Sequence, residues 1–189
     1  QLVRRLPTDA LVLQVDEPGR LGEAVAALRR TGRLRYVQPN RVYHLAALPN
    51  DPYLPFQWGL HNVGQTIQQQ VGQEDVDVDA PEAWDVTRGS SQVTVAVIDS
   101  GVDLYHPDLA GAFWTNLAEA AGQRGVDDDG NGYVDDVHGF DFYHRDATLF
   151  DPGDDEGHGT HVAGIIAGQT GDGRGIAGLA PDARLMVLK

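Results

Sequence analysis

The hydrophobic positions near the N-terminus follow two different periods. Residues 11–16 (Leu-Val-Leu-Gln-Val-Asp) have the composition of a strand, and residues 2–6 favour another strand before it. Within residues 20–31 apolar side chains recur at the i, i+3, i+4 and i+7 spacing of an amphipathic helix. Residues 33–37 and 41–45 favour extended structure. The pattern therefore predicts a small α/β unit in this part of the chain.

In the rest of the chain the pattern changes to an alternation of strands and helices. Residues 93–98 (Val-Thr-Val-Ala-Val-Ile) form a nearly continuous apolar run, which predicts a central parallel strand buried on both faces. A helical pattern begins at His158, and a second apolar run follows at residues 184–188. A short helix is expected after Asp79, with Glu82 at the spacing of a capping box. The predicted fold class is α/β with a doubly wound parallel sheet.

A domain boundary is predicted at residues 48–52, where Leu-Pro-Asn-Asp-Pro disfavours both helix and sheet. The predicted domains are therefore residues 1–48 and 49–189. The charge divides at the same place. The first domain carries eight arginines against four acids, a net +4, and the second carries six bases against 24 acids, a net −18. Three readings of this asymmetry are open: a solvated acidic surface, cation sites in the acidic part, and electrostatic attraction between the two parts.

Composition excludes several classes of function. Apolar residues make up 41% of the 189 residues and charged residues 22%, which is a globular composition. No apolar run is long enough to span a membrane. The chain has no cysteine, which excludes disulfides, zinc thiolate sites, iron–sulfur clusters and a cysteine nucleophile. The net charge of −14 argues against nucleic-acid binding, so we expect neither nucleic acid nor membrane as a partner.

Two short motifs carry candidate chemistry. Asp99-Ser100-Gly101 follows the predicted strand directly, where parallel sheets place their active sites, although an Asp after a strand is often a turn residue. The second motif, residues 158–164 (His-Gly-Thr-His-Val-Ala-Gly), opens the predicted helix. Its two histidines are three residues apart and leave a metal pair as an alternative. They lack the glutamate of the His-Glu-x-x-His zinc motif.

Together these motifs resemble the subtilisin-like serine proteases, the subtilases. The match rests on residues 97–103 (Val-Ile-Asp-Ser-Gly-Val-Asp) and on residues 158–164, in that order, and continues through residues 106–109 and 175–181. The resemblance implies that His158 is the general base and acid, and that Asp99 orients it and stabilises its imidazolium. It also implies a secreted endopeptidase that hydrolyses peptide bonds in proteins or peptides.

The third member of the triad has no candidate in this sequence. The family's nucleophilic serine follows a Gly-Thr pair well beyond the histidine helix, and the only such pair here is Gly159-Thr160. The only serines are Ser90, Ser91 and Ser100, and all of them precede the histidine motif. We therefore expect this chain to be a fragment that is inactive alone.

Residues 1–48 resemble the later part of a subtilase propeptide. In that family the propeptide is an α/β chaperone and an intramolecular inhibitor. The opposite charges of the two domains agree with such docking. The alternative is a generic small α/β module.

Acidic residues are concentrated between the two motifs. Residues 127–156 hold eleven acids and one arginine, and residues 127–136 (Asp-Asp-Asp-Gly-Asn-Gly-Tyr-Val-Asp-Asp) begin like a calcium loop. Position 12 is His138, so the loop is not an EF-hand. The predicted ligands are Asp127, Asp129, Asn131 and either Asp135 or Asp136. A solvated acidic loop without an ion is the alternative.

The resemblance implies further Ca²⁺ sites. One would combine Asp51 and Asp108 with the loop of residues 169–176, in which Asp172 supplies a side chain. Another would pair Asp141 with Asp146. A calcium-binding structural or binding module without catalysis, and a metalloenzyme built on the two histidines, are the rival classes.

Overall fold

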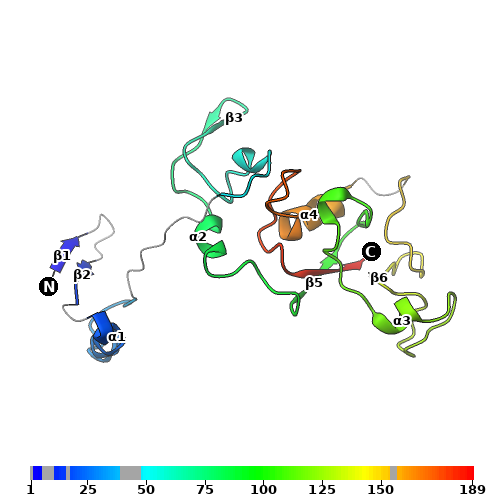
Figure 1. Ribbon diagram of the computed structural model, residues 1–189, viewed down its shortest axis with the longest axis horizontal. Helices are drawn as coiled ribbons and strands as arrows, with labels where there is room; N and C mark the ends of the chain where they lie inside the picture. Colours follow the sequence, from blue (N-terminus) through cyan, green and yellow to red (C-terminus); the bar gives the residue numbers. More distant parts are fainter. Residues whose placement is uncertain (1, 6–10, 16–17, 39–47, 154–156) are drawn as a thin grey trace. The chain divides into compact units, whose positions relative to one another are not determined.

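The computed structural model describes residues 2–5, 11–15, 18–38, 48–153 and 157–189 (Figure 1). The chain divides into two compact units, Gln1–Tyr43 and His44–Lys189. The predicted boundary at residues 48–52 lies beside residues 39–47, which fall outside the described part. The predicted extended segment 41–45 falls there as well.

The described residues of the N-terminal unit form a two-stranded antiparallel sheet and one α-helix. Strand β1 (Leu2–Arg5) pairs with β2 (Leu11–Leu13), and the 3₁₀ turn η1 (Pro18–Arg20) leads into α1 (Leu21–Arg30). The helix predicted from the apolar spacing is confirmed. Residues 33–37 form no strand.

The second unit is built on a parallel sheet of three strands. Its order is β5 (Thr94–Ile98), β7 (Arg184–Leu188) and β6 (Gly139–Phe140). Ile98 and Phe140 both lie opposite Leu188, so the three carboxyl ends meet at one edge of the sheet. The α/β prediction with a parallel sheet is confirmed.

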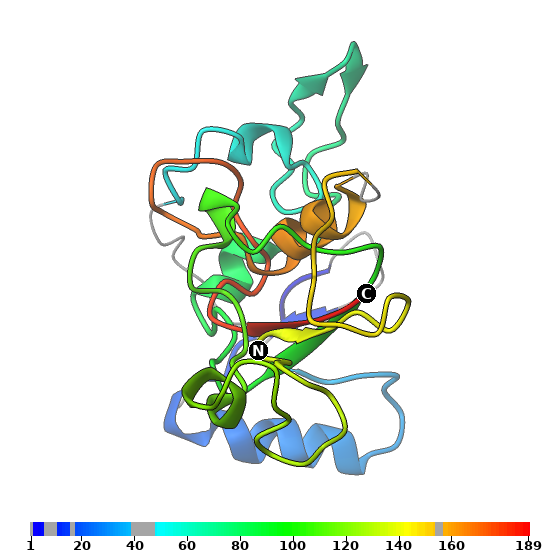
Figure 2. The ribbon, with the colours of Figure 1, turned by 90° about the vertical axis from the view of Figure 1, so that its right-hand side faces the viewer.

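Helix α4 (His158–Ala167) lies along one face of this sheet (Figure 2). Its small residues Ala163 and Ala167 are buried there with Val97, Leu185 and Val187. A Cβ on the helical Gly164 would lie 3.3 Å from Ile176 Cδ1, which agrees with close packing at this position.

The prediction that β5 is buried on both faces is wrong for this chain. Val97 is 3% exposed, whereas Ile98, which points to the opposite face, is 80% exposed. Successive side chains of a strand point to opposite faces, and α4 covers only one of them. In the described part of the chain β5 is also an edge strand, because its only partner is β7.

Short elements complete the second unit. They are η2 (Leu54–Phe56), the hairpin of β3 (Thr66–Ile67) and β4 (Gln70–Val71), α2 (Ala80–Trp84), η3 (Pro107–Leu109) and α3 (Leu117–Ala121). The helix expected after Asp79 is present, but its capping box is wrong. Asp79 adopts a left-handed conformation (φ 54°) and its side chain makes no capping hydrogen bond. Among the described residues no helix combines the length and apolar character needed to cross a bilayer.

Candidate active site and metal sites

The structure brings Asp99 and His158 together at the carboxyl edge of the sheet. Asp99 follows β5 and His158 is the first residue of α4. The ring nitrogen Nδ1 of His158 lies 2.9 Å from both carboxylate oxygens of Asp99. The hydrogen bond from His158 is the main cause that lowers the pKa of Asp99 below 3.8, against the raising effect of burial. A carboxylate that stays ionised can orient an imidazole and stabilise its charged form.

The sequence around His158 lets α4 approach the Asp99 turn closely. A Cβ on Gly159 would lie 2.2 Å from the Gly101 carbonyl oxygen, so this position requires glycine. One residue further on, Thr160 Oγ1 accepts a hydrogen bond from the Asp103 backbone N–H at 2.9 Å. These two contacts fix the start of the helix, and therefore His158, against the aspartate.

The two histidines of α4 have different surroundings. With Nδ1 turned to Asp99, the other ring nitrogen of His158, Nε2, has no partner among the described residues, and the side chain is 70% exposed. His161 is also exposed, but its side chain forms no hydrogen bond or ion pair with a described residue. Neither belongs to a group of three or more potential metal ligands in the described part of the chain. The arrangement is suited to proton transfer at Nε2 of His158.

Among the described residues, none of the three serines forms a hydrogen bond with His158. The Ser100 hydroxyl donates to Asp99 Oδ1 at 3.3 Å, on the carboxylate side of the pair. Ser90 Oγ accepts a hydrogen bond from Gln92 N. The described residues therefore provide an acid–histidine pair and no hydroxyl next to Nε2.

The acidic loop, residues 127–136, brings only part of its predicted ligand set together. Oxygens of Glu119, Asp129 and Asp136 lie within 4.8 Å of one another. The amides of Asn116 and Asn131 each donate to both Asp129 and Asp136, at distances of 2.8–3.1 Å. The hydrogen bond from Asn116 is the main cause that lowers the pKa of Asp129.

Asp127 and Asp135 point to backbone groups instead. Asp127 accepts hydrogen bonds from the N–H groups of Gly130, Asn131 and Gly132. Both oxygens of Asp135 accept from the N–H of Gly125. Of the two alternatives left open by the sequence, Asp136 is therefore the one that lies beside Asp129.

Glu119 is a functional candidate that the sequence analysis missed. This residue of α3 is buried, and its carboxylate accepts hydrogen bonds from the backbone N–H groups of Asp128, Asp129 and Asp135. It therefore holds the acidic loop in shape. Asn116, the N-cap of the same helix, lies three residues before Glu119, and this capping-box spacing was the available signal.

Asp51 and Asp108 form a second, buried carboxylate site against the loop 169–176. They are 3% and 6% exposed. Asp51 Oδ2 accepts from Gly171 N at 2.7 Å, and Asp108 Oδ2 accepts from Ile176 N at 3.0 Å. The Oδ1 atom of each is buried and has no hydrogen-bond partner among the described residues. We call Asp51, Asp108, Asp172 and this loop the Asp108 site.

The electrostatics of the Asp108 site favour a bound cation. Burial is the main cause that raises the pKa of Asp108 above 3.8, and the negative charges of Asp172 and Asp51 raise it further. The loop approaches so closely that a Cβ on Gly175 would lie 2.2 Å from Asp108 Oδ2. Buried carboxylate oxygens without donors are the hard ligands that Ca²⁺ prefers, so these residues fit that ion.

The third expected pair is differently engaged. The Asp141 carboxylate contacts the side chains of His144 and Lys189, whereas Asp146 Oδ1 accepts from the backbone N–H of Thr148. The ammonium of Lys189 and the imidazole of His144 therefore lie against the Asp141 carboxylate.

The fold class of the chain is α/β, with a parallel sheet that carries an Asp–His pair at its carboxyl edge. Comparison with known proteins identifies the family. Residues 90–189 match the model of the subtilase family, and the chain belongs to that family.

Curated relatives agree with this assignment. Subtilisin-like protease 1 of Plasmodium berghei is 38% identical over 141 residues, which are 74% of this chain and 21% of the relative. A thermophilic serine proteinase of Bacillus sp. strain AK1 is 34% identical over 172 residues, which are 90% of this chain and 33% of the relative. The chain thus spans between about a fifth and a third of the length of these relatives.

A solved structure shares the fold. The serine protease of Aeromonas sobria, in a crystal structure with its chaperone, matches with a TM-score of 0.57 and 26% identity. The match covers 84% of this chain and 23% of that protein.

Proposed function

We propose that the chain is part of a serine endopeptidase in which Asp99 and His158 act with a nucleophilic serine outside these 189 residues. The observation that supports this most directly is the contact of His158 Nδ1 with both Asp99 oxygens, 2.9 Å each, which leaves Nε2 for the nucleophile. The substrates would be proteins or peptides. His158 would take the serine proton during attack and return it to the leaving amine.

The matched pair of substitutions His158→Ala and His161→Ala tests this function in the full-length protease. The first removes the proposed base, and the second removes an exposed histidine of the same helix. Loss of peptide hydrolysis in the first variant only is expected. Equal losses would contradict the assignment of His158 as the base.

We also propose that residues 1–48 are the later part of a propeptide that inhibits residues 49–189, and that the mature enzyme is secreted. The division of charge into +4 and −18 supports electrostatic attraction between them. Cleavage would fall between Leu45 and Pro49. Mass spectrometry of the matured protease in the culture medium tests secretion and the cleavage site, and a mature N-terminus beyond Tyr53 would contradict the cleavage site.

Two calcium sites complete the proposal. At the Asp108 site an ion would contact the unpartnered Oδ1 atoms of Asp51 and Asp108, with Asp172 nearby, and would neutralise buried negative charge. At the acidic loop an ion would contact Asp129 and Asp136, with Asn131 beside them and Asp127 fixing the turn. Calcium titration monitored by calorimetry tests both sites, and the absence of any heat of binding would contradict them.

A further inference from the structure

Lys189 follows β7 and lies next to Asp99 in the sheet. Leu188, the last residue of β7, is opposite Ile98, and its carbonyl oxygen accepts the Asp99 backbone N–H at 3.1 Å. The Lys189 side chain is only 7% exposed. A buried ammonium is costly unless negative groups surround it.

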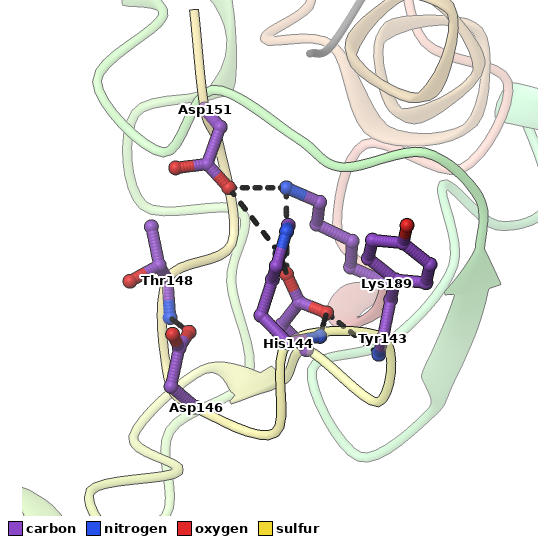
Figure 3. Close-up of polar contacts among 7 residues, drawn as sticks. Tyr143, His144, Asp146, Thr148, Asp151 and Lys189 are labelled. Carbon is purple, nitrogen blue, oxygen red and sulfur yellow. Dashed lines mark hydrogen bonds and ion pairs between the residues drawn. The ribbon is translucent and has the colours of Figure 1, made fainter.

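The ammonium of Lys189 contacts two carboxylates from the segment that follows β6 (Figure 3). It forms a hydrogen-bonded ion pair with Asp151 and lies 3.4 Å from Asp141 Oδ2. His144 Nδ1 lies 2.8 Å from the same Asp141 oxygen. Asp141, His144, Asp151 and Lys189 are called the Lys189 cluster below. Its two acids, Asp141 and Asp151, are the first and last residues of the segment 141–151, so Lys189 holds the two ends of this segment together.

Asp141 is the buried centre of the cluster. It is fully buried, and its Oδ1 accepts the backbone N–H groups of Tyr143 and His144 at 2.8 Å each. Burial alone would raise the pKa of Asp141, but the hydrogen bonds from the His144 backbone and ring, the Tyr143 backbone and Lys189 together outweigh it, so the pKa is lowered. The ammonium of Lys189 is therefore one of several groups that stabilise the Asp141 carboxylate.

The segment 141–151 also contacts the turn that carries Asp99. Leu149 is buried in the same core cluster as Val102 and Ala163, a residue of α4. Its carbonyl oxygen accepts the Val102 backbone N–H at 2.8 Å. Val102 follows Gly101, against which Gly159 of α4 packs. The segment 141–151 therefore contacts the Asp99 turn through Leu149.

We propose that Lys189 is a positioning residue for the Asp99–His158 pair. Its ammonium holds Asp141 and Asp151, which fixes the segment 141–151 and, through Leu149, the turn between Asp99 and α4. This inference rests on the proposed protease function. It assigns Lys189 no contact with substrate.

The test compares Lys189→Met with Lys189→Arg in the full-length protease. Methionine keeps the apolar stem and removes the charge, whereas arginine keeps the charge and can contact two carboxylates. A displacement of about 1 Å in a catalytic group lowers the rate by about 100-fold, so Lys189→Met is expected to lower kcat by about 10- to 100-fold with little change in KM. The acid limb of the pH–rate profile is expected to shift, and Lys189→Arg is expected to restore most of the activity.

The matched control is Arg184→Met at the other end of β7. The Arg184 guanidinium donates to the Gly111 carbonyl at 2.8 Å, away from the Asp99 edge, and this variant is expected to keep kcat. If Lys189→Met does not fold, Asp151→Asn removes one partner of the ammonium and decides the question with the same readouts. Normal kcat in a folded Lys189→Met or Asp151→Asn protein would overturn the inference. Full activity of His158→Ala would instead overturn the proposed function.

Discussion

Replacing Asp108 with asparagine tests the Asp108 site, because asparagine has nearly the same shape and no charge. An ion that binds only the folded protein, at 100 times its Kd, stabilises it by about 2.7 kcal/mol. For a domain of this size each kcal/mol changes Tm by about 2–4 °C, so calcium is expected to raise the Tm of the unmodified protein by about 5–11 °C.

Without calcium the order of the two proteins should reverse. The unmodified protein then keeps a buried carboxylate oxygen without a partner at Asp108, which costs about 1–3 kcal/mol. Asparagine removes the charge that Asp51 and Asp172 repel. We therefore expect Asp108→Asn to melt below the unmodified protein in calcium, and at or above it in metal-free buffer.

The assay is thermal unfolding of the purified protein with calcium and with chelator, beside the control Asp182→Asn. Asp182 is an exposed acid of the same unit, and its substitution should leave the calcium response unchanged. A Tm difference between Asp108→Asn and the unmodified protein that is the same with and without calcium would refute the reasoning.

The pH dependence in metal-free buffer is an independent check of the same site. The pKa of Asp108 is raised in the folded protein, chiefly by burial. Such a group contributes stability below pH 3.8, and the contribution is lost as the pH rises through the raised pKa. The unmodified protein should therefore lose stability relative to Asp108→Asn as the pH rises from 3.8 through that range.

Four further predictions concern the catalytic pair, the isolated chain, the acidic loop and the Lys189 cluster. In the full-length protease, His158→Ala is expected to lower kcat by about 10⁶-fold, the magnitude known for the triad histidine of subtilisin, and steady-state kinetics measures it. The 189-residue chain alone is expected not to hydrolyse casein, and hydrolysis that His158→Ala abolishes would contradict this. Asp129→Ala is expected to remove the calcium protection of residues 127–136 against limited proteolysis, whereas Asp135→Ala keeps it because Asp135 faces Gly125. The contact with Asp141 raises the pKa of His144. The contribution of His144 to stability is therefore present below pH 6.5 and is lost as the pH rises through the raised pKa. The Tm difference between the unmodified protein and His144→Gln should decrease over the same rise in pH.

The elements with a strong and unbroken pattern could be predicted from the sequence. The apolar run at residues 184–188 is β7, and the helical pattern that begins at His158 is α4. The pairing of Asp99 with His158 was implied by the resemblance to the subtilases. Asp99 directly follows a parallel strand, and His158 begins a helix whose glycine permits close contact.

Features that depend on distant parts of the chain could not be predicted. The capping-box spacing from Asn116 to Glu119 predicts a helix start but not the loop contacts of Glu119, because the backbone groups that it binds come from residues 128–135 after the loop folds back. The exposed face of β5 depends on what packs against it and not on its own β-branched residues. The capping box predicted at Asp79 does not form, because Asp79 adopts a backbone conformation with positive φ. In that conformation Asp77 Oδ1 accepts the Asp79 N–H.

The measurement that tests the central claim most directly is labelling of the full-length protease with a fluorophosphonate, followed by mass spectrometry of the labelled residue. Fluorophosphonates react with a serine that a neighbouring base activates. We expect one labelled serine outside these 189 residues, and we expect His158→Ala to abolish the labelling while His161→Ala retains it. Labelling of Ser90, Ser91 or Ser100, or undiminished labelling of His158→Ala, would contradict the account.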